Sequence, residues 1–274
     1  MTSNASHDQE KRRVHDFWND ASCGEKLYLA TTDREGFEAQ SAQRYALEPY
    51  ILKFAGFSST VGKKVLEIGV GLGADHQRFA EAGADLYGID LTERAIEHTG
   101  SRLQAFGLNS TLAVGDAEHL EFPEQTFDLV YSWGVLHHSP DTPKAVAEVH
   151  RVLKCGGGAR AMIYHKWSMI GLMLWVRYGL LAGKPWRSLR SIYAGHLESP
   201  GTKAYSVAEA RRLFAAFSTV HIETVLTHGD LLESAAGQRH QGAALNLARK
   251  IWPQSLIRRF FPNAGLFMLI QATK

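Results

Sequence analysis

The stretch Val65-Leu66-Glu67-Ile68-Gly69-Val70-Gly71-Leu72-Gly73 determines how the rest of this 274-residue chain is interpreted. Its apolar start predicts a buried strand, its alternating glycines a tight loop, and the helical pattern from Asp75 to Ala82 a helix directly behind the loop. Glycines let the backbone turn with positive φ and approach a ligand closely, and the first turn of a helix presents unpaired N–H groups. The stretch therefore predicts a site for a nucleotide-type ligand.

Glu67 separates two kinds of nucleotide ligand. An NAD-binding loop would place a pyrophosphate here, and a carboxylate one turn away would repel it. A ligand with an ammonium and a sulfonium group would be attracted instead. The loop alone does not exclude an NAD-dependent oxidoreductase, because Gly69-x-Gly71-x-x-Ala74 fits the dinucleotide pattern loosely.

The second predicted strand, residues 85–90, also ends in an acid. Asp90, at the tip of a strand beside the glycine loop, can accept two hydrogen bonds from a ribose diol, and Leu91 would then lie against the adenine. The alternative is that Asp90 caps the helix that starts near Thr92.

The third predicted strand, residues 111–117, contains a third acid. Asp116 can accept a hydrogen bond from N6 of an adenine while the backbone N–H of Ala117 donates to the ring. An ordinary turn aspartate is the alternative. Because three acids fall at three successive strand ends, one shared ligand is the better interpretation.

Histidines follow the fourth and fifth predicted strands. His137 and His138 lie just beyond strand 127–132, and His165 follows strand 159–164. Ligands of open parallel sheets bind outside the carboxyl ends of the strands. His138 and His165 are therefore candidate bases for an acceptor that must lose a proton, and a hydrogen-bonded structural role is the alternative for His138.

Taken together, residues 65–164 resemble the seven-stranded class I S-adenosylmethionine (SAM) methyltransferases, whose first motif is E-x-G-x-G-x-G. They are most similar to the ubiquinone/menaquinone-biosynthesis-like group. The matching segments are Gly115-Asp116-Ala117, Phe127-Asp128, Leu136-His137-His138 and Arg151-Val152-Leu153-Lys154 with Gly156-Gly157. The chain departs from that pattern at Phe122-Pro123, where the order is reversed, and at Cys155, where proline is usual.

The resemblance implies an α/β, Rossmann-like sheet of order 3-2-1-4-5-7-6 with the last strand antiparallel, and SAM as the cofactor with S-adenosylhomocysteine as its product. We assign Glu67 to the ammonium end of the methionine part and the backbone of the Gly69-to-Gly73 loop, Gly71 included, to its carboxylate end. Asp90, Leu91, Asp116 and Ala117 are assigned to the adenosine. Further cofactor contacts are expected from Ser132, Trp133 and His137.

Segments outside the resemblance are expected to enclose the acceptor. Residues 1–60 predict an N-terminal helical cap whose first nine residues are disordered, and residues 61–274 the SAM-binding domain, with 167–205 as a lid inserted after the fifth strand. The apolar helix expected from Ile170 to Leu181 needs deep burial, a lipophilic ligand or a partner subunit such as a second copy. Candidate pocket-wall residues are Tyr28, Trp167, Tyr193 and Tyr205.

Composition limits the remaining alternatives. A net charge of +2 makes no case for nucleic acid, and the distant Cys23 and Cys155 predict neither a disulfide framework nor a metal site, as in a reducing cytoplasm. The polar N-terminus is not a signal peptide, and the apolar run from Met169 to Ala182 is too short to span a bilayer. In the stretch that contains Arg249-Lys250, Trp252 and 258–261, bases and aromatics favour a solvated amphipathic helix over contact with a membrane or an acidic partner.

These observations predict a SAM-dependent methyltransferase that acts on a small molecule. Apolar and aromatic residues in the insertion favour O-methylation of an aromatic or lipophilic hydroxyl compound, and C- or N-methylation stays open. The alternatives are a SAM-binding regulatory protein without turnover and, disfavoured by Glu67 and by Asp116-Ala117, an NAD-dependent oxidoreductase.

Overall fold

The sheet has seven strands in the order β3-β2-β1-β4-β5-β7-β6. The computed structural model describes residues 2–233 and 252–274. The strands are β1 (Lys64–Ile68), β2 (Asp85–Asp90), β3 (Thr111–Val114), β4 (Phe127–Trp133), β5 (Leu153–Tyr164), β6 (Thr219–Val225) and β7 (Phe267–Thr273). The first five are parallel, and β7 is antiparallel to β5 and β6. The predicted strand order and the antiparallel last strand are confirmed.

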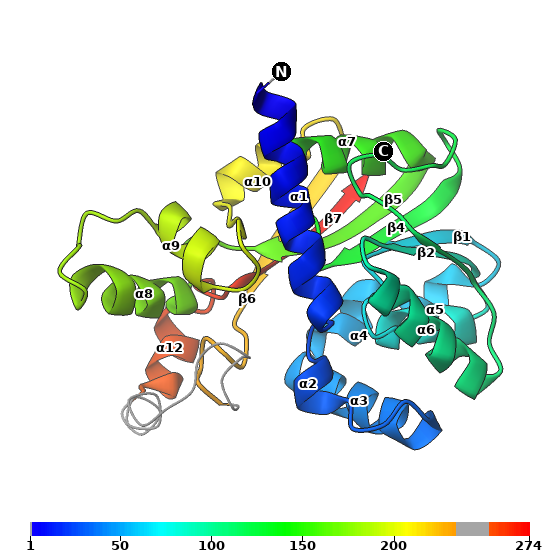
Figure 1. Cartoon of the computed structure of the whole chain (residues 1–274), viewed down its shortest axis with the longest axis horizontal. Helices are drawn as coiled ribbons and strands as arrows, with labels where there is room; N and C mark the ends of the chain where they lie inside the picture. The colour runs from blue at the N-terminus through cyan, green and yellow to red at the C-terminus, as the bar shows by residue number, and fades with distance from the viewer. Residues whose placement is uncertain (1, 234–251) are drawn as a thin grey trace.

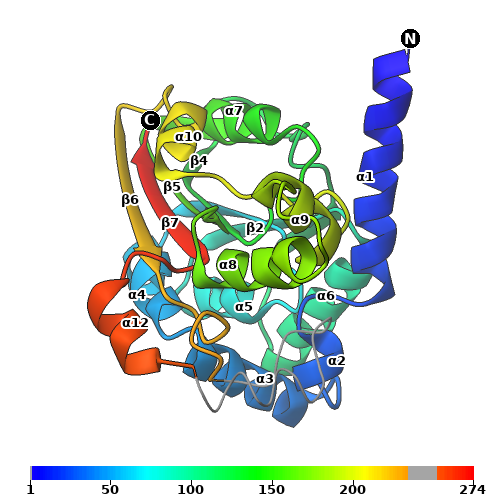
Figure 2. The ribbon, with the colours of Figure 1, turned by 90° about the vertical axis from the view of Figure 1, so that its left-hand side faces the viewer.

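Helices cover both faces of this sheet. In chain order they are α1 (Thr2–Asp20), α2 (Glu25–Tyr28), α3 (Arg34–Leu47), α4 (Tyr50–Ala55), η1 (Phe57–Thr60), α5 (Ala74–Glu81), α6 (Glu93–Phe106), α7 (Thr142–Val152), α8 (Met169–Trp175), η2 (Val176–Leu180), α9 (Leu189–His196), α10 (Val207–Leu213) and α12 (Gln254–Phe260). Figures 1 and 2 show α7 and α10 on one face and α4 and α5 on the other.

Alternation along the strands divides the core between the two faces. Leu66 and Ile68 of β1 pack in the cluster that includes α7 and α10, whereas Val65 packs in the cluster with α4 and α5. This is the period-2 pattern of a strand that is buried on both sides. Glu67 has the parity of Val65, so it faces the α5 side at the carboxyl end of β1.

The N-terminal segment differs from the prediction in two ways. Helix α1 begins at Thr2, so the disorder expected for the first nine residues is wrong for residues 2–9, and Met1 lies outside the described residues. His7 and Lys11 contact the carboxylate of Glu118, and these long-range contacts are invisible in a polar terminal sequence. The expected helix from Arg34 to Phe54 is broken before Pro49, which disfavours helical backbone at the residue before it.

The insertion between β5 and α10 consists of α8, η2 and α9. Ser168 and Ser188 cap α8 and α9 by accepting hydrogen bonds from backbone N–H groups three residues on. The predicted capping box of Ser206 and Glu209 starts α10. Among the described residues, every helix is too short or too polar to span a membrane.

Candidate functional site

A cavity of about 940 Å³ lies at the carboxyl ends of the parallel strands. Its walls come from the β1–α5 loop, the ends of β2, β4 and β5, the N-terminal helices and the insertion. Eleven of the residues predicted from the sequence line it, namely Glu67, Gly69, Gly71, Gly73, Asp90, Leu91, Asp116, Ala117, Trp133, His138 and Tyr28.

The glycine loop presents bare backbone to this cavity. Gly71 has φ +52°, a left-handed conformation that L side chains rarely adopt, and a Cβ built there would meet no described atom within 4 Å. The loop therefore keeps open space next to its backbone. This is what close approach of a ligand requires, and it precedes the first turn of α5.

Glu67 is buried behind the loop, with a side chain only 3% exposed. Its Oε2 lies 2.9 Å from Nδ1 of His76, and Nε2 of His76 lies 2.7 Å from the hydroxyl of Ser110. Burial, and then the nearby Asp75, raise the pKa of Glu67 well above its ordinary value, and burial lowers the pKa of His76 to about 3. Both shifts favour uncharged side chains in this pair.

Asp90 closes the loop from the end of β2. Its Oδ2 accepts a hydrogen bond from the backbone N–H of Gly71 at 3.2 Å, and its Oδ1 accepts from the N–H and hydroxyl of Thr92. The N-cap of α6 is Thr92, which bonds to Ala95. Asp90 is therefore not the helix cap, and it is held against the loop with its carboxylate on the cavity wall.

Asp116 carries an interaction that the sequence did not reveal. Lys11 of α1 donates to its Oδ2 at 2.5 Å and to Glu118 at 2.7 Å. The other oxygen of Asp116 accepts from the backbone N–H of Glu118. Because Lys11 also lines the cavity, α1 is tied to the wall on which the adenine was expected.

Two predicted cofactor contacts lie beneath the cavity wall. Ser132 has the parity of Val130 on β4, is 1% exposed, and points to the α7 side of the sheet. His137 is fully buried against the ring of Tyr164, with the ring centroids 3.9 Å apart. Among the described residues neither nitrogen of His137 has a hydrogen-bond partner, and burial lowers its pKa well below the ordinary value.

Four further predicted site residues do not line the cavity. His165 is buried, with Nδ1 3.1 Å from the carbonyl of Gly265. Trp167 is 62% exposed, and the hydroxyl of Tyr193 bonds to Ser168. Tyr205 lies beside His165, to which it is joined by a single β-bridge.

His138 lines the cavity, and two hydroxyl groups hold its Nδ1 in place. Nδ1 lies 2.8 Å from the hydroxyl of Ser199 and 3.2 Å from that of Thr202. The Thr202 hydroxyl donates its proton to the carbonyl of Ser199, so it can only accept from Nδ1. The Ser199 hydroxyl can either donate to Nδ1 or accept from it, so these contacts orient the ring of His138 and are compatible with a proton on either ring nitrogen.

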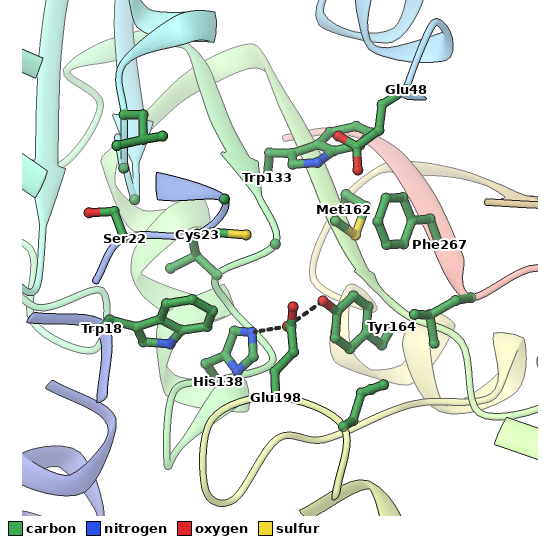
Figure 3. Close-up of a pocket in the computed structure, with 18 of the residues that line it drawn as sticks. Trp18, Ser22, Cys23, Glu48, Trp133, His138, Met162, Tyr164, Glu198 and Phe267 are labelled. Carbon is green, nitrogen blue, oxygen red and sulfur yellow. Dashed lines mark hydrogen bonds and ion pairs between the residues drawn. The ribbon is translucent and has the colours of Figure 1, made fainter. Parts of the chain in front are cut away.

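Glu198 lies beside Nε2 of His138. Its Oε2 is 3.4 Å from Nε2 of His138 and accepts a hydrogen bond from the hydroxyl of Tyr164 at 2.5 Å (Figure 3). Ligand atoms of His137, His138 and Glu198 lie within 4.8 Å of one another. The three residues are therefore close enough to hold a metal ion, and the contact between His138 and Glu198 also suits proton transfer.

Arg44 and Glu48 are among the charged residues of the cavity wall that the sequence analysis missed. Arg44 of α3 donates to both carboxylate oxygens of Asp75, at 2.7 and 3.3 Å, and lies 3.5 Å from Glu48. Burial, opposed by Arg44, raises the pKa of Glu48 to about 7. In the sequence, Arg44 and Glu48 form no local pattern that marks a site. They reach the cavity wall only because of where α3 packs.

Aromatic side chains form one wall of the cavity. Trp133, Met162, Phe267 and Tyr164 lie together across the cavity from Trp18 and Cys23 (Figure 3). The rings of Tyr164 and Phe267 are stacked at 5.8 Å, and Trp133 meets Phe267 edge-on at 5.8 Å.

Comparison with known proteins agrees with this geometry. Residues 65–157 match a family model described as "Methyltransferase domain". A sterol 24-C-methyltransferase of Yarrowia lipolytica is 34% identical over 99 residues, which are 35% of this chain and 26% of that protein. An uncharacterized methyltransferase of Bacillus subtilis, YcgJ, is 38% identical over 95 residues, which are 34% of this chain and 38% of that protein. The similarity therefore covers the segment around the glycine loop and less than half of each relative.

A solved structure extends the likeness in fold to nearly the whole chain. Geranyl diphosphate C-methyltransferase from Streptomyces coelicolor A3(2) superposes with a TM-score of 0.64 over 96% of this chain and 97% of that chain, at 17% identity. At that identity the likeness concerns the fold alone. The relatives support the general methyltransferase resemblance and do not single out the ubiquinone/menaquinone group.

Proposed function

We propose that the chain is a SAM-dependent methyltransferase that methylates a lipophilic small molecule, with a hydroxyl oxygen as the favoured acceptor. The observation that carries the proposal is one cavity with two unlike halves. One half has bare glycine backbone and the carboxyl groups of Glu67, Asp90 and Asp116, and the other is aromatic and apolar around His138. At about 940 Å³ the cavity is near the top of the usual range of roughly 300–1,000 Å³ for ligand pockets, which leaves room for two molecules.

The first half fits SAM chemically. Asp90 would accept from the ribose hydroxyls and Asp116 from the adenine amine, while the open backbone at Gly71 leaves space for the methionine part. Arg44 offers a guanidinium on the same wall for a carboxylate, and Glu67 a carboxyl group for an ammonium. SAM would supply an activated methyl group, so the chain's main task is to position the acceptor.

In the second half His138 is the candidate base. In the tautomer that carries its proton on Nδ1, directed at Ser199 and Thr202, a hydroxyl acceptor would lose its proton to Nε2 as its oxygen gains the methyl group. Glu198, 3.4 Å away, would stabilise the imidazolium that results. His165 is not a candidate any longer, because it is bonded to Gly265 away from the cavity.

The flanking segments would act as covers. We assign residues 1–60 the role of a cap over the cofactor half, because Lys11 and Arg44 line it. Residues 167–205 would be a lid over the acceptor half, to which Leu172, Leu174 and Glu198 contribute. The apolar side chains that α8 turns into the cavity favour a lipophilic acceptor.

The test is a methyl-transfer screen with the purified chain and SAM. Phenols, quinols, carboxylates, amines, thiols and isoprenoid alkenes serve as acceptors, and mass spectrometry detects the added methyl group. Transfer to a lipophilic hydroxyl compound is expected. Binding of S-adenosylhomocysteine with no transfer to any class would favour the regulatory alternative, and thermal stabilisation by NAD but not by S-adenosylhomocysteine would overturn the proposal.

A further inference from the structure

Exposed apolar side chains are concentrated in two segments of the fold. Among the described residues, twelve large apolar side chains are exposed, and eight of these lie in residues 167–186 or 256–261. They are Trp167, Leu172, Leu180, Leu181, Trp186, Leu256, Phe260 and Phe261. Leu181 and Trp186 are 78% and 77% exposed, which is unusual for side chains that folding normally buries.

The two segments belong to one end of the molecule. A backbone hydrogen bond from Met169, at the start of α8, to Ala264, just after α12, joins them. Figure 1 shows α8 and α12 on the same side of the molecule, away from α6. We call residues 167–190 and 252–264 together the distal surface.

The distal surface is strongly basic. Its sequence contains Arg177, Lys184, Arg187, Arg190, Arg258 and Arg259 and not one Asp or Glu. The whole chain has a net charge of +2, so the remainder has a net charge of −4. Arg258 pairs with Glu233 from outside the surface and still has 55% of its side chain exposed. The positive charge is thus localised rather than spread over the protein.

Exposed tryptophan, leucine and phenylalanine among arginine and lysine is the composition of segments that lie in a membrane interface. The apolar side chains enter the headgroup region, and the cations are attracted to anionic lipid. We propose that the distal surface docks this protein on a bilayer that contains anionic lipid. Pairing with a second copy is disfavoured, because it would bring two such basic surfaces together.

The sequence alone favoured a solvated helix for the part of this surface around α12. Of the residues behind that interpretation, Arg249 and Lys250 lie outside the described residues. The exposure of Leu181 and Trp186, on a different segment at the same end, now supplies an apolar partner for the exposed Phe260 and Phe261. The membrane interpretation therefore depends on both segments and not on the basic stretch alone.

The surface also borders the cavity. Leu172, Arg177 and Leu181 are exposed and at the same time line the cavity wall. When the protein is docked, the apolar half of the cavity would open toward the bilayer. A lipophilic acceptor could then enter the cavity without crossing water. This last step rests on the proposed function, whereas the docking itself does not.

The test is co-sedimentation of the full chain with lipid vesicles. Vesicles of phosphatidylcholine mixed with phosphatidylglycerol are expected to bind the protein, less tightly as salt is added, and vesicles of phosphatidylcholine alone much less. The variants Leu181→Ser/Trp186→Ser and Lys184→Glu/Arg190→Glu are each expected to weaken binding at least about tenfold. All four side chains are exposed, so the fold is expected to persist.

Matched controls are available at the amino end of the central strand β1, on a different segment from the distal surface. Val61→Ser and Lys63→Glu change an exposed apolar and an exposed basic side chain near the start of β1, and they are expected to leave vesicle binding unchanged. No binding to anionic vesicles, or equal binding by all variants, would overturn the proposal. So would a dimer in light scattering that the distal variants dissociate. Calorimetry with S-adenosylhomocysteine on the same variants reads the proposed function separately.

Discussion

Nδ1 of His76 lies 2.9 Å from Oε2 of Glu67, and at most 3% of either side chain is exposed. Beyond His76, the Ser110 hydroxyl donates to the carbonyl of Leu86, so it must accept from Nε2 of His76. With Nε2 protonated, a single additional proton is shared between Glu67 and Nδ1. Burial favours its position on the carboxyl group.

Glu67→Gln is expected to separate stability from cofactor binding. The amide can donate to Nδ1 of His76 as the carboxylic acid does, so the free energy of unfolding at about pH 5 should change by less than about 1 kcal/mol. The affinity for SAM should fall at least about tenfold, because glutamine cannot give up a proton to become the anionic partner of a bound ammonium. Urea unfolding and calorimetry measure the two effects.

The pH dependence of the free energy of unfolding tests whether Glu67 is protonated in the folded protein. The folded-state pKa of Glu67 is raised above the ordinary 4.5, so its contribution to stability is complete below about pH 4.5 and is lost as pH rises through the folded pKa. Glutamine does not titrate. The variant should therefore gain stability relative to the wild type as pH rises above about 4.5. A constant difference would mean that Glu67 is ionised in the folded protein.

Asp90→Ala is expected to lower the affinity for S-adenosylhomocysteine at least about tenfold, because two hydrogen-bond acceptors for a ribose are removed. Asp85→Ala is the matched control, since Asp85 begins the same strand, is exposed and does not line the cavity. Calorimetry measures both, with thermal unfolding as a check that the loop at Gly71 is intact. Unchanged binding in Asp90→Ala would reject the ribose role.

Lys11→Met is expected to loosen α1 rather than unfold the domain. Burial alone would raise the pKa of Glu118, but hydrogen bonds from Lys11 and Ser139 lower it to about 2. Exchange of the α1 amides should accelerate about tenfold or more at neutral pH, because one partner of a largely buried ion pair is lost. Lys26→Met removes an exposed pair with Asp20 and should have no such effect.

Acid should reproduce part of this loosening in the wild type. The depressed pKa of Glu118 contributes stability that is present above about pH 4.5 and is lost as pH falls toward about 2. Hydrogen exchange of α1 against pH measures it. If Lys11→Met and the wild type lose protection of α1 over the same acid range and to the same degree, Lys11 does not hold the helix.

His138→Gln and His165→Gln test which histidine acts on the acceptor. With a hydroxyl acceptor, His138→Gln should lower kcat by about 10²–10⁴ and leave the affinity for S-adenosylhomocysteine nearly unchanged. His165→Gln should retain most of the wild-type rate if it folds, because His165 faces Gly265 and not the cavity. Single-turnover assays and calorimetry give the two quantities. Equal losses in both variants would point to a structural effect.

The sheet order and the glycine loop could be predicted because each depends on local pattern. The run from Val65 to Gly73 specifies a strand, a turn and a helix start within one segment. The alternation of side chains along a strand could also have been used to decide which other residues face the site. Trp133 shares the face of Tyr131, whereas Ser132 and His165 share that of Val130 and Ile163. Applying this alternation would have removed Ser132 and His165 from the site.

Long-range charge pairs could not be predicted from the sequence. Lys11 reaches Asp116 across 105 positions, and Glu198 meets His138 only because the loop after α9 folds back over β5. Arg44 and Glu48 are amphipathic-helix residues by pattern and become cavity residues through the packing of α3. Such contacts follow from the placement of elements, which no short window of residues encodes.

Cys23→Trp is expected to impair the acceptor half of the cavity and to leave the cofactor half intact. Cys23 lies across from Trp133 and Phe267, so a bulky ring there would occupy acceptor space and leave Asp90 and the glycine loop untouched (Figure 3). Turnover should fall at least about tenfold, because a small misplacement of the acceptor strongly slows an in-line transfer, while calorimetry should find the affinity for S-adenosylhomocysteine within about threefold of wild type. Cys155→Trp on the exposed surface is the control for bulk and hydrophobicity. Equal loss of cofactor affinity and turnover in Cys23→Trp would show that the halves are not separate.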